Sequence, residues 1–208
     1  MYSDDFSKIS QLVVDYDFNN KNIEDLCGSP INFSEIDNVF ADLNAGMNSF
    51  DFVILNNYIK EKGIKKVTEL GCGSTSQFLD MIGVQRKTFA LTQAAGSRPI
   101  EYIQCDIFKN SQAILESAED SDMILIDSLH SYEMSSFYYE KILSICKKPV
   151  FMHDIFDKNK NCYSEQTFWE EHIAGKSYNL IISSNAYPPQ RTDEIYPQVC
   201  AIWEPIFD

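Results

Sequence analysis

Two glycines and a nearby carboxylate stand where a short apolar stretch gives way to a helical pattern. Residues 67–70 contain Glu69, and Gly71 and Gly73 follow directly. A strand, a glycine turn and a helix in this order let a ligand lie against bare backbone at the helix N-terminus. A carboxylate beside the turn suits a cationic amine and ribose hydroxyls better than a phosphate. An ordinary strand-to-helix turn has the same spacing, so this segment alone leaves both interpretations open.

Carboxylates and histidines end two further apolar stretches. Asp127 ends one of them, with His130 three residues later, and His153 and Asp154 end the next. Neighbouring strands lie about 4.8 Å apart, so Asp127 and Asp154 would face one cleft and share a proton or a cation. Mg²⁺ takes one or two carboxylates and keeps places for water and substrate. His130, at the mouth of this cleft, can take a proton from a substrate hydroxyl near neutral pH.

Each of these residues also has a purely structural interpretation. Asp127 can cap the following helix, His130 can be a loop histidine, and His153 with Asp154 can form a turn. Their joint position at two strand ends favours a functional cluster. The third histidine, His172, lies mid-helix and is expected to be structural or exposed.

The elements that must position these residues alternate between apolar strands and amphipathic helices. Predicted helices cover residues 51–62, 76–82, 111–117, 132–146 and 165–173. Predicted strands cover residues 66–70, 88–92, 101–104, 122–127, 149–153, 178–183 and 198–203. This alternation predicts an α/β fold with a doubly wound, seven-stranded, mostly parallel Rossmann-like sheet and an antiparallel C-terminal edge hairpin. Ligands of such sheets bind outside the carboxyl ends of the strands.

The composition and net charge of the chain indicate its domain organisation and the kind of partner that it binds. Residues 1–50 are rich in Asp and Asn and predict a helical N-terminal extension packed on a core domain of residues 51–208. The formal net charge of −14 repels nucleic acid and anionic membranes, so a neutral or cationic small molecule is the expected partner. A cytoplasmic location is expected because no signal-peptide core or membrane-length apolar stretch is present. A homodimer is compatible with the sequence, which leaves the oligomeric state open.

The cysteine pattern bears on metal binding and redox compartment. The six cysteines are scattered, with no CxxC pair. This pattern predicts buried free thiols rather than a zinc site or a disulfide framework.

Three motifs together resemble one enzyme family. The sequence ELGCGST at residues 69–75 resembles the first motif of class I S-adenosylmethionine-dependent methyltransferases. The sequences IDSLHSYE at 126–133 and FMHDI at 151–155 resemble later strand ends in the branch of small-molecule O-methyltransferases that includes macrocin O-methyltransferase. The resemblance spans roughly residues 50–205 and implies methyl transfer from S-adenosylmethionine to a hydroxyl.

The resemblance also implies roles for individual residues. The implied S-adenosylmethionine ligands lie at the ends of the first four strands: Glu69, Gly71, Gly73, Ser74, Thr92, Asp106 and Asp127. Among them, Asp106 would meet the adenine amino group. Asp127, Asp154 and His153 would hold a divalent cation such as Mg²⁺. His130 would be the general base and would act together with Asp127.

The sequence departs from the family at two points. Most members carry an acid at the end of the second strand, where this chain has Thr92 and Gln93. Metal-dependent members often carry paired acids after the fifth strand, where this chain has His153 and Asp154. The acceptor pocket is expected to draw on the N-terminal extension and on the loop 185–193. In that loop Tyr187 and Arg191 are candidate contacts, although an ordinary exposed loop explains them more simply.

Two other functions are consistent with these observations. One is a non-catalytic nucleotide- or partner-binding protein that keeps the methyltransferase fold. The other is a dinucleotide-dependent oxidoreductase, although Ser76 stands where GxGxxG requires its third glycine. The sequence does not identify the methyl acceptor, and it does not indicate whether oxygen, nitrogen or carbon is methylated.

Overall fold

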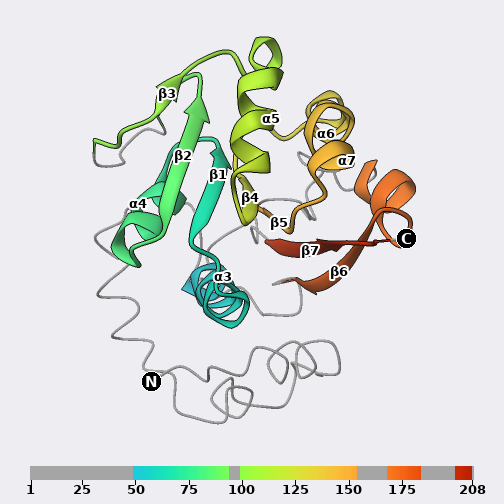
Figure 1. Cartoon of the computed structure of the whole chain (residues 1–208), viewed down its shortest axis with the longest axis horizontal. Helices are drawn as coiled ribbons and strands as arrows, with labels where there is room; N and C mark the ends of the chain where they lie inside the picture. The colour runs from blue at the N-terminus through green and yellow to red at the C-terminus, as the bar shows by residue number, and fades with distance from the viewer. Residues whose placement is uncertain (1–48, 94–98, 154–167, 184–199, 208) are drawn as a thin grey trace, which may run out of the picture.

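A seven-stranded sheet forms the centre of the structure (Figure 1). The computed structural model describes residues 49–93, 99–153, 168–183 and 200–207. The strands lie in the order β3-β2-β1-β4-β5-β7-β6. Their bounds are β1 Lys66–Leu70, β2 Gln85–Ala90, β3 Ile103–Gln104, β4 Met123–Ile126, β5 Val150–Met152, β6 Tyr178–Ser183 and β7 Ala201–Pro205. Strands β1 to β5 are parallel, and β7 is antiparallel to both β5 and β6. The predicted mostly parallel sheet with an antiparallel edge hairpin is confirmed.

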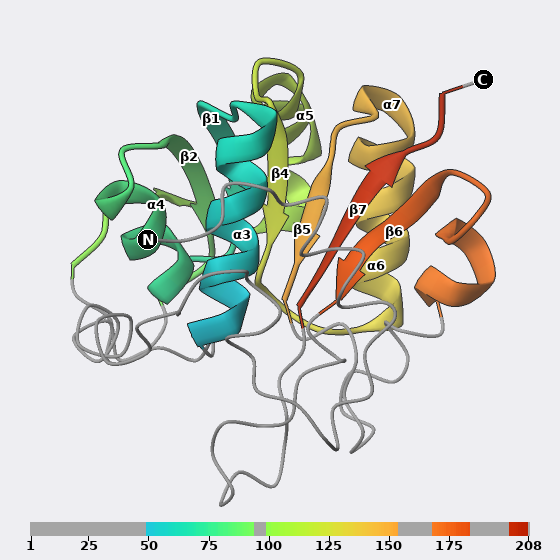
Figure 2. The same cartoon turned by 90° about the horizontal axis from the view of Figure 1, so that it is seen from below.

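Helices cover both faces of this sheet (Figure 2). One face carries α3 (Ser49–Lys62) and α4 (Ser74–Met81). The other carries α5 (Ser111–Glu119), α6 (Tyr132–Tyr138), the π-helical η3 (Tyr139–Leu143), α7 (Ser144–Cys146) and the π-helical η4 (Trp169–Ile173). A short 3₁₀ helix, η2 (Ile107–Lys109), follows β3. Doubly wound packing of this kind leaves the carboxyl ends of the parallel strands at one edge of the sheet.

Strand β4 shows how the core is divided. Met123 and Leu125 pack into the cluster beneath α3 and α4, whereas Ile124 and Ile126 pack into the cluster beneath α5 and α6. All four side chains are buried because successive residues of a strand point to opposite faces. The unbroken apolar run predicted such a doubly covered strand.

The second strand differs from its predicted bounds at both ends. β2 begins at Gln85 and ends at Ala90, so Thr92 lies beyond the strand rather than at its end. The strand was predicted to begin at residue 88, because residues 85–87 are polar. In the structure the Arg86 guanidinium donates two hydrogen bonds of 2.8 Å to the carboxylate of Asp80 at the end of α4. This pairing lets a charged residue occupy a nearly buried strand position.

Several sequence predictions fall outside the described residues. These are the N-terminal extension up to residue 48, and the side chains of Asp154, Tyr187 and Arg191. Within the described ranges, no helix combines the length and apolar character required to cross a bilayer. The four cysteines in those ranges, Cys72, Cys105, Cys146 and Cys200, are free thiols.

Candidate functional site

The glycine turn after β1 packs directly against the end of β4. Gly71 has a φ of +106°, a region that favours glycine, and its N–H donates to the Phe89 carbonyl at 2.9 Å. A Cβ atom at Gly71 would lie 1.7 Å from the carbonyl oxygen of Asp127. The space beside this glycine is therefore filled by the backbone of Asp127. Contact between Gly71 and a ligand stays a prediction.

The second glycine, Gly73, is the N-cap residue of α4, and a chain of hydrogen bonds connects it to the first strand. The Gly73 N–H donates to the Ser76 hydroxyl at 3.2 Å, and that hydroxyl donates to Oε2 of Glu69 at 2.8 Å. The Thr88 hydroxyl on β2 donates to the same oxygen at 2.5 Å. Through these two hydrogen bonds, the Glu69 side chain connects the first turn of α4 to strand β2.

Glu69 is a buried carboxyl with one unsatisfied oxygen. Its side chain is 1% exposed, and its Oε1 has no hydrogen-bond partner among the described residues. Burial raises the pKa of Glu69 to about 7, against the opposing effects of the Thr88 and Ser76 hydroxyls and of Arg86, 3.9 Å away. An orphaned buried oxygen at this position is the kind of group that a ligand's donor would satisfy.

The raised pKa of Glu69 predicts a specific pH dependence of stability. Between about pH 4.5 and about pH 7 the folded chain keeps a proton that the unfolded chain has lost, so stability falls as pH rises through this window. We expect the wild type to lose roughly 2–3 kcal/mol of unfolding free energy relative to Glu69→Gln between about pH 5 and about pH 8. Urea unfolding of both proteins at these two pH values measures the difference. Parallel profiles would contradict the burial of an ionisable Glu69.

Asp127, whose side chain is 24% exposed, joins the buried Asp51 and His153 in a polar cluster at the end of β4. The Thr75 hydroxyl donates to its Oδ2 at 2.9 Å, and His153 Nδ1 lies 3.3 Å from its Oδ1. On the far side of the imidazole, Nε2 lies 3.6 Å from Oδ2 of Asp51. The prediction that β4 and β5 are neighbours is confirmed, since Ile126 pairs with Met152. That pairing is what brings Asp127 and His153 together.

The environment of Asp127 keeps its carboxylate ionised. Burial alone would raise the pKa of Asp127, but the charge and hydrogen bond of His153, the Thr75 hydroxyl and the nearby His130 outweigh it. Together they lower the pKa to about 2. A fixed negative charge therefore faces the switch point between β1 and β4 at neutral pH. Sequence reasoning missed Thr75 and Asp51, although Thr75 closes the ELGCGST motif.

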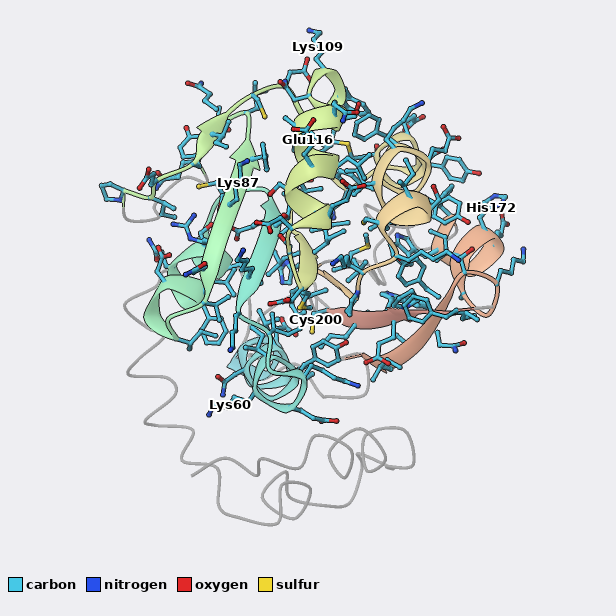
Figure 3. All side chains as sticks on the ribbon, in the orientation of Figure 1. Lys60, Lys87, Lys109, Glu116, His172 and Cys200 are labelled. Carbon is cyan, nitrogen blue, oxygen red and sulfur yellow. The ribbon has the colours of Figure 1, made fainter. Side chains whose placement is uncertain are left out.

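The remaining predicted cofactor residues lie along the same edge of the sheet. Ser74 begins α4, and Thr92 is exposed beyond β2. Asp106 caps η2 by accepting a hydrogen bond from the Phe108 N–H at 3.1 Å, and it forms an ion pair of 2.9 Å with Lys109, which is labelled in Figure 3. Hydrogen bonding and charge from Lys109 lower the pKa of Asp106. Their roles toward a cofactor stay predictions.

The described residues alone do not make a metal centre. They contain no group of three histidine, cysteine or acidic side chains that could hold an ion. Each ring nitrogen of His153 faces a carboxylate, an arrangement that does not suit a metal ligand. Asp127 keeps lone pairs that a cation could use, and Asp154 lies outside the described residues.

The third histidine, His172, contacts other residues than those around Asp127. His172 Nε2 is 3.0 Å from the Tyr132 hydroxyl, and its ring packs on Phe168 with centroids 5.1 Å apart. Figure 3 shows it at the outer margin of the molecule, on η4. The side chain is about half exposed, as predicted.

Comparison with known proteins reveals likeness in fold. No protein-family model matches the sequence, and no curated protein matches it significantly. An O-methyltransferase from Bacillus cereus, in complex with S-adenosylhomocysteine, is 13% identical with a TM-score of 0.51, over 88% of this chain and 94% of that one. A candidate caffeoyl-CoA O-methyltransferase from Staphylococcus aureus is 14% identical with a TM-score of 0.52, over 82% and 91%.

A third solved structure is a larger protein. The methyltransferase MycE of the mycinamycin biosynthetic pathway, in complex with Mg, S-adenosylhomocysteine and mycinamycin VI, is 11% identical with a TM-score of 0.52. The match covers 86% of this chain but 56% of MycE. At these identities the likeness concerns the fold, and it agrees with the strand order and the antiparallel β7 described above. The chain therefore has the fold of class I S-adenosylmethionine-dependent methyltransferases.

Proposed function

We propose that this protein transfers the methyl group of S-adenosylmethionine to a hydroxyl of a small molecule. The observation that carries the proposal is the ionised Asp127 packed against the glycine turn at the switch point between β1 and β4. Ligands of doubly wound sheets bind at this point. A fixed negative charge there is complementary to the sulfonium and amine groups of the cofactor. The methyltransferases that share the fold support the same assignment.

Exposed apolar side chains at the same edge suit the adenine ring. Leu91 follows β2, Phe108 lies in η2 after β3, and Leu129 follows β4. All three are exposed despite their size. Large apolar side chains gathered at a binding edge commonly line a ligand site. We assign them to the faces of the purine, with Asp106 near its amino group.

The acceptor chemistry requires deprotonation of a hydroxyl and alignment with the methyl group. His130 is half-buried and acts electrostatically on Asp127, so it lies near the ionised cluster. We assign it the role of general base. A divalent cation held by Asp127 and Asp154 would lower the pKa of the acceptor hydroxyl. Because the donor is already activated, the protein mainly supplies position and proton transfer.

The assignment of His130 predicts a split between binding and turnover. We expect His130→Ala to lower methyl transfer by about 10²–10⁴-fold, with S-adenosylhomocysteine affinity unchanged. Transfer of radiolabelled methyl from S-adenosylmethionine to a panel of small hydroxyl compounds measures turnover. His172→Ala is the matched control and should keep full activity, since its contacts are with Tyr132 and Phe168. Equal turnover of His130→Ala and wild type would remove His130 from the mechanism.

One observation favours a second function. Thr92 is exposed beyond β2, and no carboxylate stands at the end of β2 to hold the ribose hydroxyls. A non-catalytic nucleotide- or partner-binding protein with the same fold would not need that contact. Binding of S-adenosylhomocysteine without methyl transfer to any compound of the panel would favour this alternative.

A further inference from the structure

We infer that Asp51 is a positioning residue, which fixes the His153 ring so that this ring in turn orients Asp127. No motif singles out Asp51, which lies on a helix that precedes the first strand. The inference rests on the proposed function, in which Asp127 faces the cofactor. Its experimental test separates the two.

The position of Asp51 is unusual for a carboxylate. It lies in the first turn of α3 and is fully buried. Figure 2 shows α3 in front of the sheet, over one of its faces. A buried carboxylate is costly unless it is paired with a cation or hydrogen-bond donors. His153 Nε2 lies 3.6 Å from Asp51 Oδ2, which is an ion-pair distance for a protonated imidazole and is longer than a hydrogen bond.

The His153 ring is held between two carboxylates on opposite sides. Its backbone N–H donates to the Ile126 carbonyl at 3.0 Å, which fixes the residue beside the end of β4. Its ring is nearly inaccessible to solvent, with Nδ1 facing Asp127 and Nε2 facing Asp51. A flipped ring would place carbon atoms opposite both carboxylates. Asp51 therefore selects the orientation in which Nδ1 donates to Asp127.

Asp127 depends on this orientation. Among the described residues, Thr75 donates to one of its carboxylate oxygens and His153 to the other. Without the Asp51 carboxylate, the His153 ring could change its orientation. One of the two Asp127 oxygens would then lose its hydrogen-bond donor. In metal sites, the outer partners that orient a ligating side chain typically contribute about 10–100-fold in affinity or activity, and we expect an effect of the same order here. Asp51 thus connects the face of the sheet under α3 to the site at its carboxyl edge.

The experiment compares three variants of the full chain by calorimetry with S-adenosylhomocysteine and by NMR of the histidine ring nitrogens. We expect Asp51→Ala to weaken binding by about tenfold or more and to shift the His153 ring resonances. Asp51→Asn keeps an acceptor of the same shape and should restore binding to within about threefold of wild type. Ile54→Ala, one turn along α3 in the apolar core, is the matched control. It should lower the melting temperature but change neither the ring resonances nor the affinity.

The outcomes distinguish this inference from the proposed function. If wild type and Asp51→Ala bind S-adenosylhomocysteine equally, the inference is overturned and the proposed function stands. If wild type does not bind, the proposed function fails, and unshifted ring resonances in Asp51→Ala overturn the inference as well. Shifted resonances would then support it. Should Asp51→Ala not fold, Asp51→Val, which fills more of the space without an acceptor, carries the same expectation.

Discussion

Replacement of Gly71 by Ala is expected to cost about 2–6 kcal/mol of unfolding free energy and to abolish cofactor binding. Two independent effects add in this variant. The backbone at φ +106° is strained for any residue with a Cβ atom, and that atom would overlap the Asp127 carbonyl at 1.7 Å. The overlap is with backbone, which cannot rotate away, so the turn and the end of β4 must separate. Urea unfolding measures the first effect, and calorimetry measures the second.

Gly83→Ala is the matched control for this prediction. Gly83 also has a positive φ, +76°, but a Cβ atom there would meet nothing within 4 Å. The control should therefore cost only the backbone strain, about 1–2 kcal/mol, and leave binding intact. If both variants lost the same amount of unfolding free energy, Gly71 would not be in close contact with the Asp127 carbonyl.

Asp127→Ala is expected to destabilise the chain by about 3–5 kcal/mol, because it removes a carboxylate partner of the buried His153. His153 would then keep Asp51 as its only carboxylate among the described partners, and the Thr75 hydroxyl would lose its acceptor. Because the pKa of Asp127 is lowered to about 2, its stabilisation is present above about pH 4 and is lost as pH falls through about 2. Acid titration of the unfolding free energy should show this loss in wild type and not in the variant.

A surface carboxylate provides the comparison for Asp127. Asp120 forms an exposed ion pair of 3.1 Å with Lys66, so Asp120→Ala should change stability by no more than about 1 kcal/mol. If Asp127→Ala changed the unfolding free energy as little as Asp120→Ala, the pairing of Asp127 with His153 would be contradicted. Asp127→Asn, which keeps the shape but loses the charge, should also lose any response to Mg²⁺ if the cation binds there.

Patterns in the sequence predicted those elements whose formation depends mainly on residues close together along the chain. The bounds of β1 and β6 agree with the predicted strands, because apolar runs ended by glycine or serine are strong local signals. The position of Asp127 at the carboxyl edge also followed from the apolar stretch before it. The start of β2 was missed because the burial of Arg86 depends on Asp80, a partner in another element.

The contacts that join distant segments could not be predicted from local patterns. Asp51 and His153 are about a hundred residues apart, and no spacing rule connects a carboxylate on α3 with the end of β5. The packing of Gly71 against the Asp127 backbone joins two segments more than fifty residues apart, and no local pattern indicates it; the contact of Gly71 with a ligand stays a prediction. Likewise, the burial of Glu69 beneath the turn follows from Ser76 and Thr88, which lie on two different elements.

Calorimetric titration of the wild-type chain with S-adenosylhomocysteine, in Mg²⁺ and then in EDTA, is the direct test of cofactor binding at the Asp127 edge of the sheet. We expect a micromolar dissociation constant, equivalent to about −8 kcal/mol. Weaker binding in EDTA would add the cation to the site, and equal binding would leave cofactor recognition to the protein alone. Absence of binding in both buffers would contradict the proposed methyltransferase.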